Sequence, residues 1–205
     1  MAQGRPRSSP GRPPTIEDPQ GTIRLAAARL FAENGYGVTS LQDVAGAVGM
    51  TKAGLYHYFP TKQALFDAIV LSTLTDLIRG AEAVLADTAP APDKLRRFML
   101  AHAGFFAAHG DRYKASFFGS PGLSTAAFTG EQLALRRAYV RILETLIEDG
   151  TRSGALQVDD VPVLARGILG MLNWMARWYR PDGPKPATEI AGTYADIVLA
   201  GILPR

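Results

Sequence analysis

Residues 39–62 read TSLQDVAGAVGMTKAGLYHYFPTK, and two short helical patterns follow one another within this segment. Residues 39–42 have the form of a capping box, after which apolar side chains recur at helical spacing until Gly49 interrupts them. Thr51 is a favourable cap for a second helix, which Pro60 ends. Two short helices joined by a tight turn that contains glycine are typical of a helix-turn-helix motif.

The second helix of such a motif enters the major groove of DNA, while the first crosses the phosphate backbone. Residues 54–62 add ring side chains, a lysine and helix N-terminal N–H groups, and a surface of this kind suits phosphate binding. The same spacing also fits a hairpin in any helical bundle. Tyr56, Tyr58 and Phe59 would then be core aromatics, and the helical period turns Phe59 inward.

A further helix is expected before this motif. Asp18 and Pro19 fit the N-cap and the first helical position, and apolar side chains keep helical spacing over residues 23–31. Gly35 follows as a stop signal. The sequence therefore predicts a three-helix domain over residues 18–64.

The remaining residues, 65–205, read as a larger helical body, so the predicted fold class is all-α. Thr61 caps a long helix over about residues 62–85, and residues 89–92 form a hinge-like loop. Further helices are expected over residues 93–108, 112–118, 130–153, 159–179 and 186–203. The small, polar loop 119–130 either gates a pocket or merely connects two helices.

The composition excludes several classes of protein. The chain has no cysteine, so disulfides, thiolate zinc sites and a cysteine nucleophile are ruled out. The best apolar stretch, residues 168–176, is interrupted by Gly170 and Asn173 and is too short to cross a membrane. Residues 1–14 lack the apolar core of a signal peptide. We therefore expect a cytoplasmic protein without a membrane partner.

The first residues have the composition of a flexible arm, because residues 1–17 are rich in Pro, Gly, Ser and Arg. The net charge of +3 is contained in residues 1–62, where a polyanionic partner would bind. Arg5, Arg7 and Arg12 belong to two Gly-Arg-Pro units that resemble minor-groove AT-hook elements. Either these arginines enter an A·T-rich minor groove, or the arm is a solvated tail.

Residues 22–66 also carry a family resemblance, in five short segments. These are TIRLAA at 22–27, FAENGY at 31–36, TSLQDVA at 39–45, GLYHYF at 54–59 and KQAL at 62–65. In order and spacing they resemble the DNA-binding domain of the TetR/AcrR regulators. The resemblance implies a one-component transcription regulator without a cofactor, whose partners are double-stranded operator DNA and a small-molecule effector. Repression is the family's usual mode.

The resemblance assigns two groups of DNA contacts. Lys52, Ala53 and Gly54 occupy the first turn of the recognition helix, where the family reads base edges, and Lys52 can donate to guanine. The group near the phosphates comprises Thr39, Ser40, Tyr56, His57, Tyr58 and Lys62, and Thr51, the cap of the recognition helix, is a further DNA-binding candidate. Several relatives have a larger polar side chain near Gly54, so base reading here rests on fewer groups or on DNA shape.

The resemblance also implies a homodimer, which the family forms through its last two long helices. In this chain the last expected helix carries an apolar stripe with small residues beside it. The stripe consists of Ile190, Tyr194, Ile197, Val198, Gly201 and Ile202, beside Ala191, Gly192, Ala195 and Ala200. Two-fold symmetry is also what a palindromic operator requires.

The effector-site candidates are Phe117, Asn173, Trp174, Arg177 and Trp178. Asn173 and Arg177 are four residues apart in an otherwise apolar helix, and a buried polar group needs a partner or a ligand. Aromatic rings with a guanidinium suit an anionic or planar organic molecule. Residues 173–174 and 178–181 also resemble TetR-type regulators that respond to acyl-CoA thioesters. Trp178 fits a dimer or domain contact equally well.

Two other function classes remain to be weighed, a small helical enzyme and a structural bundle. An enzyme would need converging polar groups, and only His102 and His109, with Asp111 nearby, approach a metal or acid–base site. His57 has no carboxylate or nucleophile at suitable local spacing. A structural bundle leaves residues 54–62 unexplained. We therefore expect no enzyme activity, no catalytic residue and no metal.

Overall fold

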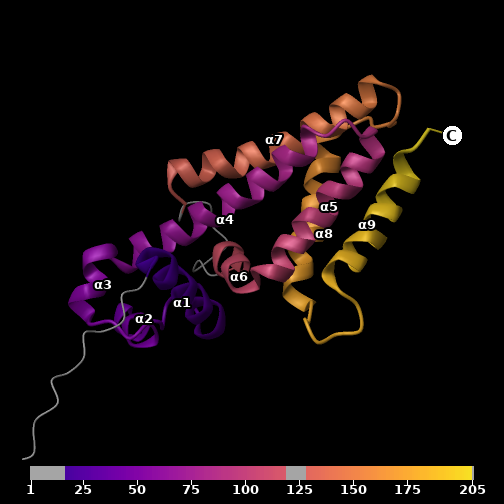
Figure 1. Ribbon diagram of the computed structural model, residues 1–205. Helices are drawn as coiled ribbons and strands as arrows, with labels where there is room; N and C mark the ends of the chain where they lie inside the picture. The colour runs from indigo at the N-terminus through magenta and orange to yellow at the C-terminus, as the bar shows by residue number, and fades with distance from the viewer. Residues whose placement is uncertain (1–16, 119–127, 205) are drawn as a thin grey trace, which may run out of the picture.

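The computed structural model describes residues 17–118 and 128–204. The helices in these ranges are α1 (Pro19–Asn34), α2 (Leu41–Ala47), α3 (Lys52–Tyr58), α4 (Lys62–Leu85), α5 (Ala91–Ala108), α6 (Gly110–Phe118), α7 (Gly130–Arg152), α8 (Val161–Trp178) and α9 (Ala187–Ile202). Figure 1 shows α1–α3 grouped at one end, with α4 leading from them into a larger helical body. The predicted all-α fold class is confirmed.

The N-terminal helices enclose their own hydrophobic core. Its fully buried members include Ile23 of α1, Val44 of α2 and Leu55 of α3. The first half of α4 closes this core with Phe66, and α6 adds Ala115. The N-terminal end of the fold is therefore completed by helices that follow residue 61 in the chain.

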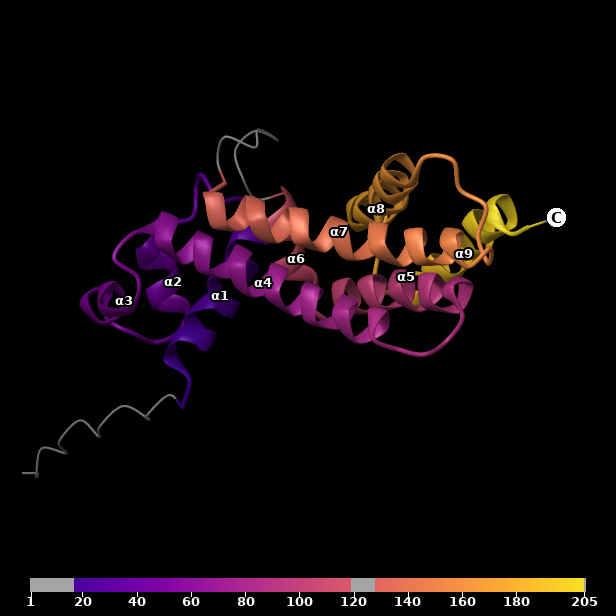
Figure 2. The same cartoon turned by 90° about the horizontal axis from the view of Figure 1, so that it is seen from above.

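Helix α4 joins the two parts of the molecule. It contacts α1 and α6, and it packs against α5 and α7; the Gln132 amide near the start of α7 donates to Asp67 near the start of α4 at 2.9 Å. Seen from above, α4 and α7 lie along one another, while α5 lies among α4, α7, α8 and α9 (Figure 2). No helix in the described ranges is long and apolar enough to cross a membrane.

The expected helix bounds hold to within two residues, and one loop prediction is wrong. Residues 89–92 do not form a hinge, because α5 already begins at Ala91, with Pro90 as its N-cap. Pro92 lies in the first turn of this helix, where its missing N–H has no helical partner to lose.

The predicted apolar stripe on α9 is only partly free for a partner chain. Ala191 and Ala195 are fully buried, and Val198 is nearly so, because these residues belong to the face of α9 that packs on α5. Small side chains let the two helices approach closely. Ile197 faces outward and is 63% exposed.

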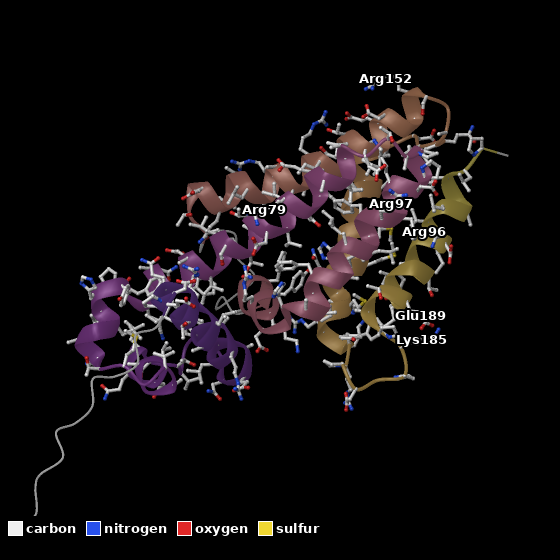
Figure 3. All side chains as sticks on the ribbon, viewed as in Figure 1. Arg79, Arg96, Arg97, Arg152, Lys185 and Glu189 are labelled. Atoms are coloured by element: carbon white, nitrogen blue, oxygen red, sulfur yellow. The ribbon has the colours of Figure 1, made fainter. Side chains whose placement is uncertain are left out.

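Most ion pairs lie on the surface of the molecule rather than in its hydrophobic cores. Arg96 of α5 pairs with Asp196 of α9, and Lys185 bonds Glu189 at 2.8 Å before the first turn of α9 (Figure 3). Exposed pairs of this kind each contribute at most about 1 kcal/mol. The arrangement of the helices is therefore set mainly by the two hydrophobic cores.

Candidate functional site

The turn between α2 and α3 is fixed by local hydrogen bonds. Ser40 and Asp43 form a reciprocal capping box, so the box lies one residue later than the sequence pattern suggested. Hydrogen bonds from the Ser40 backbone N–H and hydroxyl lower the pKa of the Asp43 carboxyl. Gly49 has φ 67°, which favours glycine, and Thr51 caps α3 by accepting from the Gly54 N–H at 3.1 Å.

Helix α3 has one buried and one exposed face. Leu55 and, just after the helix, Phe59 are buried in the N-terminal core. Lys52, Ala53 and Tyr56 are exposed. The inward turn of Phe59 agrees with the helical period, whereas the exposure of Tyr56 argues against a core role. The first turn of α3 therefore presents a cation and a small apolar surface to the solvent.

A Cβ at Gly54 would lie 3.2 Å from the Thr51 hydroxyl oxygen, so a larger side chain there presses on the cap of α3. His57 is exposed, and its ring meets the half-buried Tyr58 edge-on at 5.2 Å between centroids. The Lys52 ammonium lies 5.7 Å from the centroid of the Tyr56 ring. The exposed side chains of α3 therefore lie next to one another on this face of the helix.

Lys62 is placed differently from the sequence expectation. Its ammonium donates to the carbonyl oxygens of Tyr36 at 2.8 Å, Gly37 at 3.2 Å and Thr39 at 3.0 Å. An ammonium has three donors, and these bonds use all three. Lys62 therefore ties the start of α4 to the loop between α1 and α2, and no donor is left for the predicted phosphate contact.

Thr39 is also turned inward, because its side chain is 3% exposed and its hydroxyl donates to the Gly35 carbonyl at 3.0 Å. Sequence reasoning placed Thr39 at a phosphate because a local pattern cannot reveal a bond to the end of the preceding helix. Arg5, Arg7 and Arg12 lie outside the described residues.

The effector candidates divide between two faces of α8. Asn173 is half-buried and faces α6, where its side-chain oxygen accepts a hydrogen bond from the Tyr113 hydroxyl. Trp174 and Trp178 are 63% and 47% exposed, and Arg177 is exposed with its guanidinium 5.6 Å from the Trp174 ring centroid. Only Asn173 of the four α8 candidates borders one of the two cavities described below.

The difference between Asn173 and the other three α8 candidates comes from the width of the buried face of α8. Its centre is formed by Ile168, Leu172 and Met175, and Asn173 lies at its edge. One further turn along the helix, at Arg177, the edge position has already rotated outward. Trp174, Arg177 and Trp178 therefore do not line either of the two cavities beside the buried network, and Trp178 borders a separate surface pocket before α9.

A buried polar network occupies the centre of the body. His102 of α5 bonds the hydroxyls of Tyr113 of α6 and Tyr139 of α7, each at 2.8 Å. Since the Tyr113 hydroxyl donates to Asn173, it accepts from His102 Nε2–H, and Tyr139 donates to Nδ1. Burial lowers the pKa of His102 to about 4 and raises the pKa of both tyrosines, so all three are neutral near pH 7.

This network also settles the structural role of His102. Both ring nitrogens have tyrosine partners, while His109 lies on the surface at the end of α5. In the described ranges no group of three or more His, Cys, Asp or Glu side chains could hold a metal ion. The two histidines and Asp111 therefore do not converge on one site.

Two cavities, each partly open to solvent, adjoin the network and share Tyr139 as a wall. The smaller, of about 100 Å³, is lined by Leu74, Phe117, Arg136, Tyr139, Val140, Leu169 and Asn173. The larger, of about 210 Å³, is lined by Asp76, Leu77, Gly80, Ala81, Phe98, Ala101, His102, Phe105 and Tyr139. Each is smaller than the usual ligand pocket of about 300–1,000 Å³, so a ligand would have to displace some of the lining side chains.

The effector candidates Phe117 and Asn173 line the same cavity, whereas sequence reasoning missed Arg136, Tyr113 and Tyr139. Phe117 stacks on Tyr113 with 4.4 Å between ring centroids. The Arg136 guanidinium lies over the rings of Phe117 and Phe128. Arg136 follows the buried Gln132 by four residues and precedes Tyr139 by three. That helical spacing was a usable signal for an inward-facing arginine.

Helix α6 connects the cavities to the N-terminal core. Ala115 is buried among residues of α1 and α4, while Tyr113 and Phe117 contact the cavity side. Arg112 bonds Asp76 of α4 at 2.8 Å, and the Ser116 hydroxyl donates to Thr73 of α4 at 3.1 Å. A displacement of α6 would therefore act directly on α4 and α1.

Comparisons with known proteins agree with this geometry. The family model described as bacterial regulatory proteins of the tetR family matches residues 23–69, and the tetracyclin repressor-like C-terminal domain matches residues 88–202. The HTH-type transcriptional repressor KstR2 of Mycobacterium tuberculosis is 28% identical over 196 residues, covering 91% of this chain and 94% of that protein.

Two solved structures are similar over most of their length. PfmR, a TetR family transcriptional regulator from Thermus thermophilus, is 38% identical with a TM-score of 0.80, covering 87% of this chain and 97% of that one. AibR in complex with isovaleryl coenzyme A and operator DNA is 28% identical with a TM-score of 0.75, covering 87% and 96%. Because the C-terminal model spans more than half of the sequence and the N-terminal model covers the helix-turn-helix, the chain belongs to the TetR family of DNA-binding transcription regulators.

Proposed function

We propose that the protein is a homodimeric repressor that binds a palindromic operator and releases it when a small organic molecule enters the helical body. The observation that carries this proposal is the position of α6. This helix contributes Ala115 to the core beneath the helix-turn-helix and Phe117 to the wall of the smaller cavity. Occupation of the cavity and the orientation of α3 are thereby mechanically linked.

The proposed DNA contacts follow the exposure of α3. Lys52, Ala53 and Gly54 would face base edges, because they form the first turn of the recognition helix. The phosphate contacts are proposed for Thr51, Tyr56, His57 and Tyr58, and Ser40 could join them only by giving up its bond to Asp43. Thr39 and Lys62 act instead by holding the loop before α2. For the arm residues Arg5, Arg7 and Arg12 we keep the proposal of a minor-groove contact.

The proposed dimer interface is the outward face of α8 and α9. Val163, Gly167, Gly170 and Trp174 recur at helical spacing on α8, and all four are exposed. Two large apolar residues separated by glycines suit close packing against a symmetry-related helix. Ile197 of α9 extends the surface, and Trp178 fits this contact better than either cavity.

Release follows from the coupling of two binding sites. A ligand that displaces Phe117 or Tyr113 shifts α6, which is bonded to α4 through Arg112 and Ser116. The two recognition helices must stay about 34–36 Å apart, or a multiple of this distance, to enter successive major grooves. A small pivot of α4 in each subunit therefore weakens both half-sites, and ligand and operator must weaken each other by the same factor.

The test is to select DNA fragments from a random pool with the purified dimer, and then to titrate the selected operator with ligands. Acyl-CoA thioesters are the first compounds, since the similar AibR was solved with isovaleryl coenzyme A and operator DNA. We expect a palindromic site and weaker binding in the presence of one ligand class. Recovery of no preferred sequence would contradict the proposal, as would operator affinity that no ligand class changes.

A further inference from the structure

Arg136 of α7 is an unusual arginine for the interior of a helical body. One terminal nitrogen, Nη2, donates to the Ser116 carbonyl at 3.0 Å. Its Nε is buried and has no hydrogen-bond partner among the described residues. The guanidinium carbon lies 4.8 Å from the Phe117 ring centroid and 4.1 Å from that of Phe128. The cation is thus held between two aromatic rings.

No carboxylate compensates this charge in the part of the chain that the structure describes. Residues 119–127, which follow α6 in the sequence, include no Asp or Glu either. By contrast, the half-buried Arg112 has Asp76 at 2.8 Å. Burial lowers the pKa of Arg136, but a guanidinium stays charged in proteins. A partly desolvated charge without a counter-ion is costly to maintain, which suggests that the counter-ion arrives from outside.

The surroundings of Arg136 are those of an anion site with an apolar extension. Beside the guanidinium, the smaller cavity offers the Asn173 amide, and its other walls include Leu74, Val140 and Leu169. Beyond Tyr139, the larger cavity carries one carboxylate, that of Asp76, which already pairs with Arg112. A second anionic group on a ligand would be repelled there. The smaller cavity therefore suits a ligand that presents an anionic group to Arg136 and an apolar part to Leu74, Val140 and Leu169.

We propose that Arg136 binds an oxyanion of the effector, a carboxylate or a phosphate, and that the apolar part of the ligand packs against Leu74, Val140 and Leu169. This inference rests on the proposed ligand-responsive function and names the group that recognises the ligand. Because Arg136 also bonds the Ser116 carbonyl on α6, an arriving anion competes for the guanidinium that holds this helix. The charge of the ligand therefore affects the position of α6, which is bonded to α4.

The test compares Arg136→Gln with Arg137→Gln, since the neighbouring Arg137 is exposed and its replacement changes the net charge by the same amount. Three probe series with equal alkyl chains are used: free carboxylates, their CoA thioesters and neutral primary alcohols. Binding is measured by calorimetry and by ligand-induced thermal shift. We expect Arg136→Gln to weaken one or both anionic series about tenfold to hundredfold, with alcohols and Arg137→Gln little affected. The affected series identifies a carboxylate or a phosphate as the bound group.

A second measurement separates ligand recognition from a structural role. Without ligand, Arg136→Gln should lower the melting temperature only slightly more than Arg137→Gln does, because the hydrogen bond to Ser116 is lost but a charge without a carboxylate partner is removed as well. A much larger loss of stability would overturn the inference, as would equal affinity of both variants for every anionic probe or failure of any anionic probe to bind the wild type. Operator binding by the ligand-free protein is measured separately, so a failure of the proposed repressor function is distinguishable.

Discussion

Replacing Lys62 with methionine is expected to loosen the N-terminal domain rather than to remove a phosphate contact. The ammonium bonds three carbonyl oxygens of the loop between α1 and α2, and it lies 4.5 Å from the Tyr36 ring centroid. Methionine has a side chain of similar length, but it has no donor. The loop would therefore lose its attachment to the first turn of α4.

The magnitude follows from the three bonds and their exposure. A hydrogen bond to a charged group contributes about 1.5–3 kcal/mol, but the Gly37 bond is exposed, so water can replace part of what is lost. We expect the free energy of unfolding to fall by about 2–3 kcal/mol in total. For a chain of this size, that corresponds to a melting temperature lower by about 4–12 °C.

The assay pairs thermal unfolding with operator affinity at several salt concentrations. Lys52→Ala is the control: this exposed lysine should cost about 1–3 kcal/mol of operator binding and leave the melting temperature unchanged. Lys62→Met should show the reverse: its melting temperature should fall, and the dependence of operator affinity on salt concentration should not change. A wild-type melting temperature together with a salt slope reduced by about one would refute the reasoning and return Lys62 to the phosphates.

Three further outcomes are expected. Burial lowers the pKa of His102 from 6.5 to about 4, so the unfolded state binds a proton that the folded state does not bind between these pH values. The free energy of unfolding should therefore fall by about 3 kcal/mol as the pH drops from 6.5 to 4. Denaturant titrations of His102→Gln should lack this part of the pH dependence. Gly150→Ala places a Cβ 2.5 Å from Leu156 Cδ1 and should cost about 1–3 kcal/mol of stability, whereas Gly80→Ala, with open space on α4, should gain up to about 1 kcal/mol. Trp174→Glu should yield folded monomers by analytical ultracentrifugation, and a persistent dimer would exclude this face.

Local patterns were sufficient for most of the fold. The caps at Asp18, Thr51 and Thr61 and the helix-stopping glycines act within a few residues, so a one-dimensional pattern contains them. The inward turn of Leu55 and Phe59 likewise follows from the helical period alone. The family resemblance added the order of the helices in the body.

Contacts between distant residues were beyond the same reasoning. Lys62 meets carbonyls more than twenty residues earlier, and Tyr113 meets Asn173 sixty residues later. Whether a lysine faces DNA or its own backbone depends on a loop conformation that no spacing rule specifies. Arg136 shows the remaining difficulty, because its helical position indicates burial, but only the assembled fold reveals the absence of a carboxylate.

The burial of Ala115 bears on how such regulators could be recombined. Because α6 inserts this residue into the core formed by α1–α4, the sequence boundary near residue 64 does not separate two independent bodies. A chimera joined at that boundary would pack α6 of one protein against the N-terminal helices of another, and the two surfaces would not be complementary. Replacing only the exposed residues of α3 would leave the packing of α6 on α1–α4 unchanged. New operator preferences are therefore more readily acquired by substituting single residues than by exchanging whole domains.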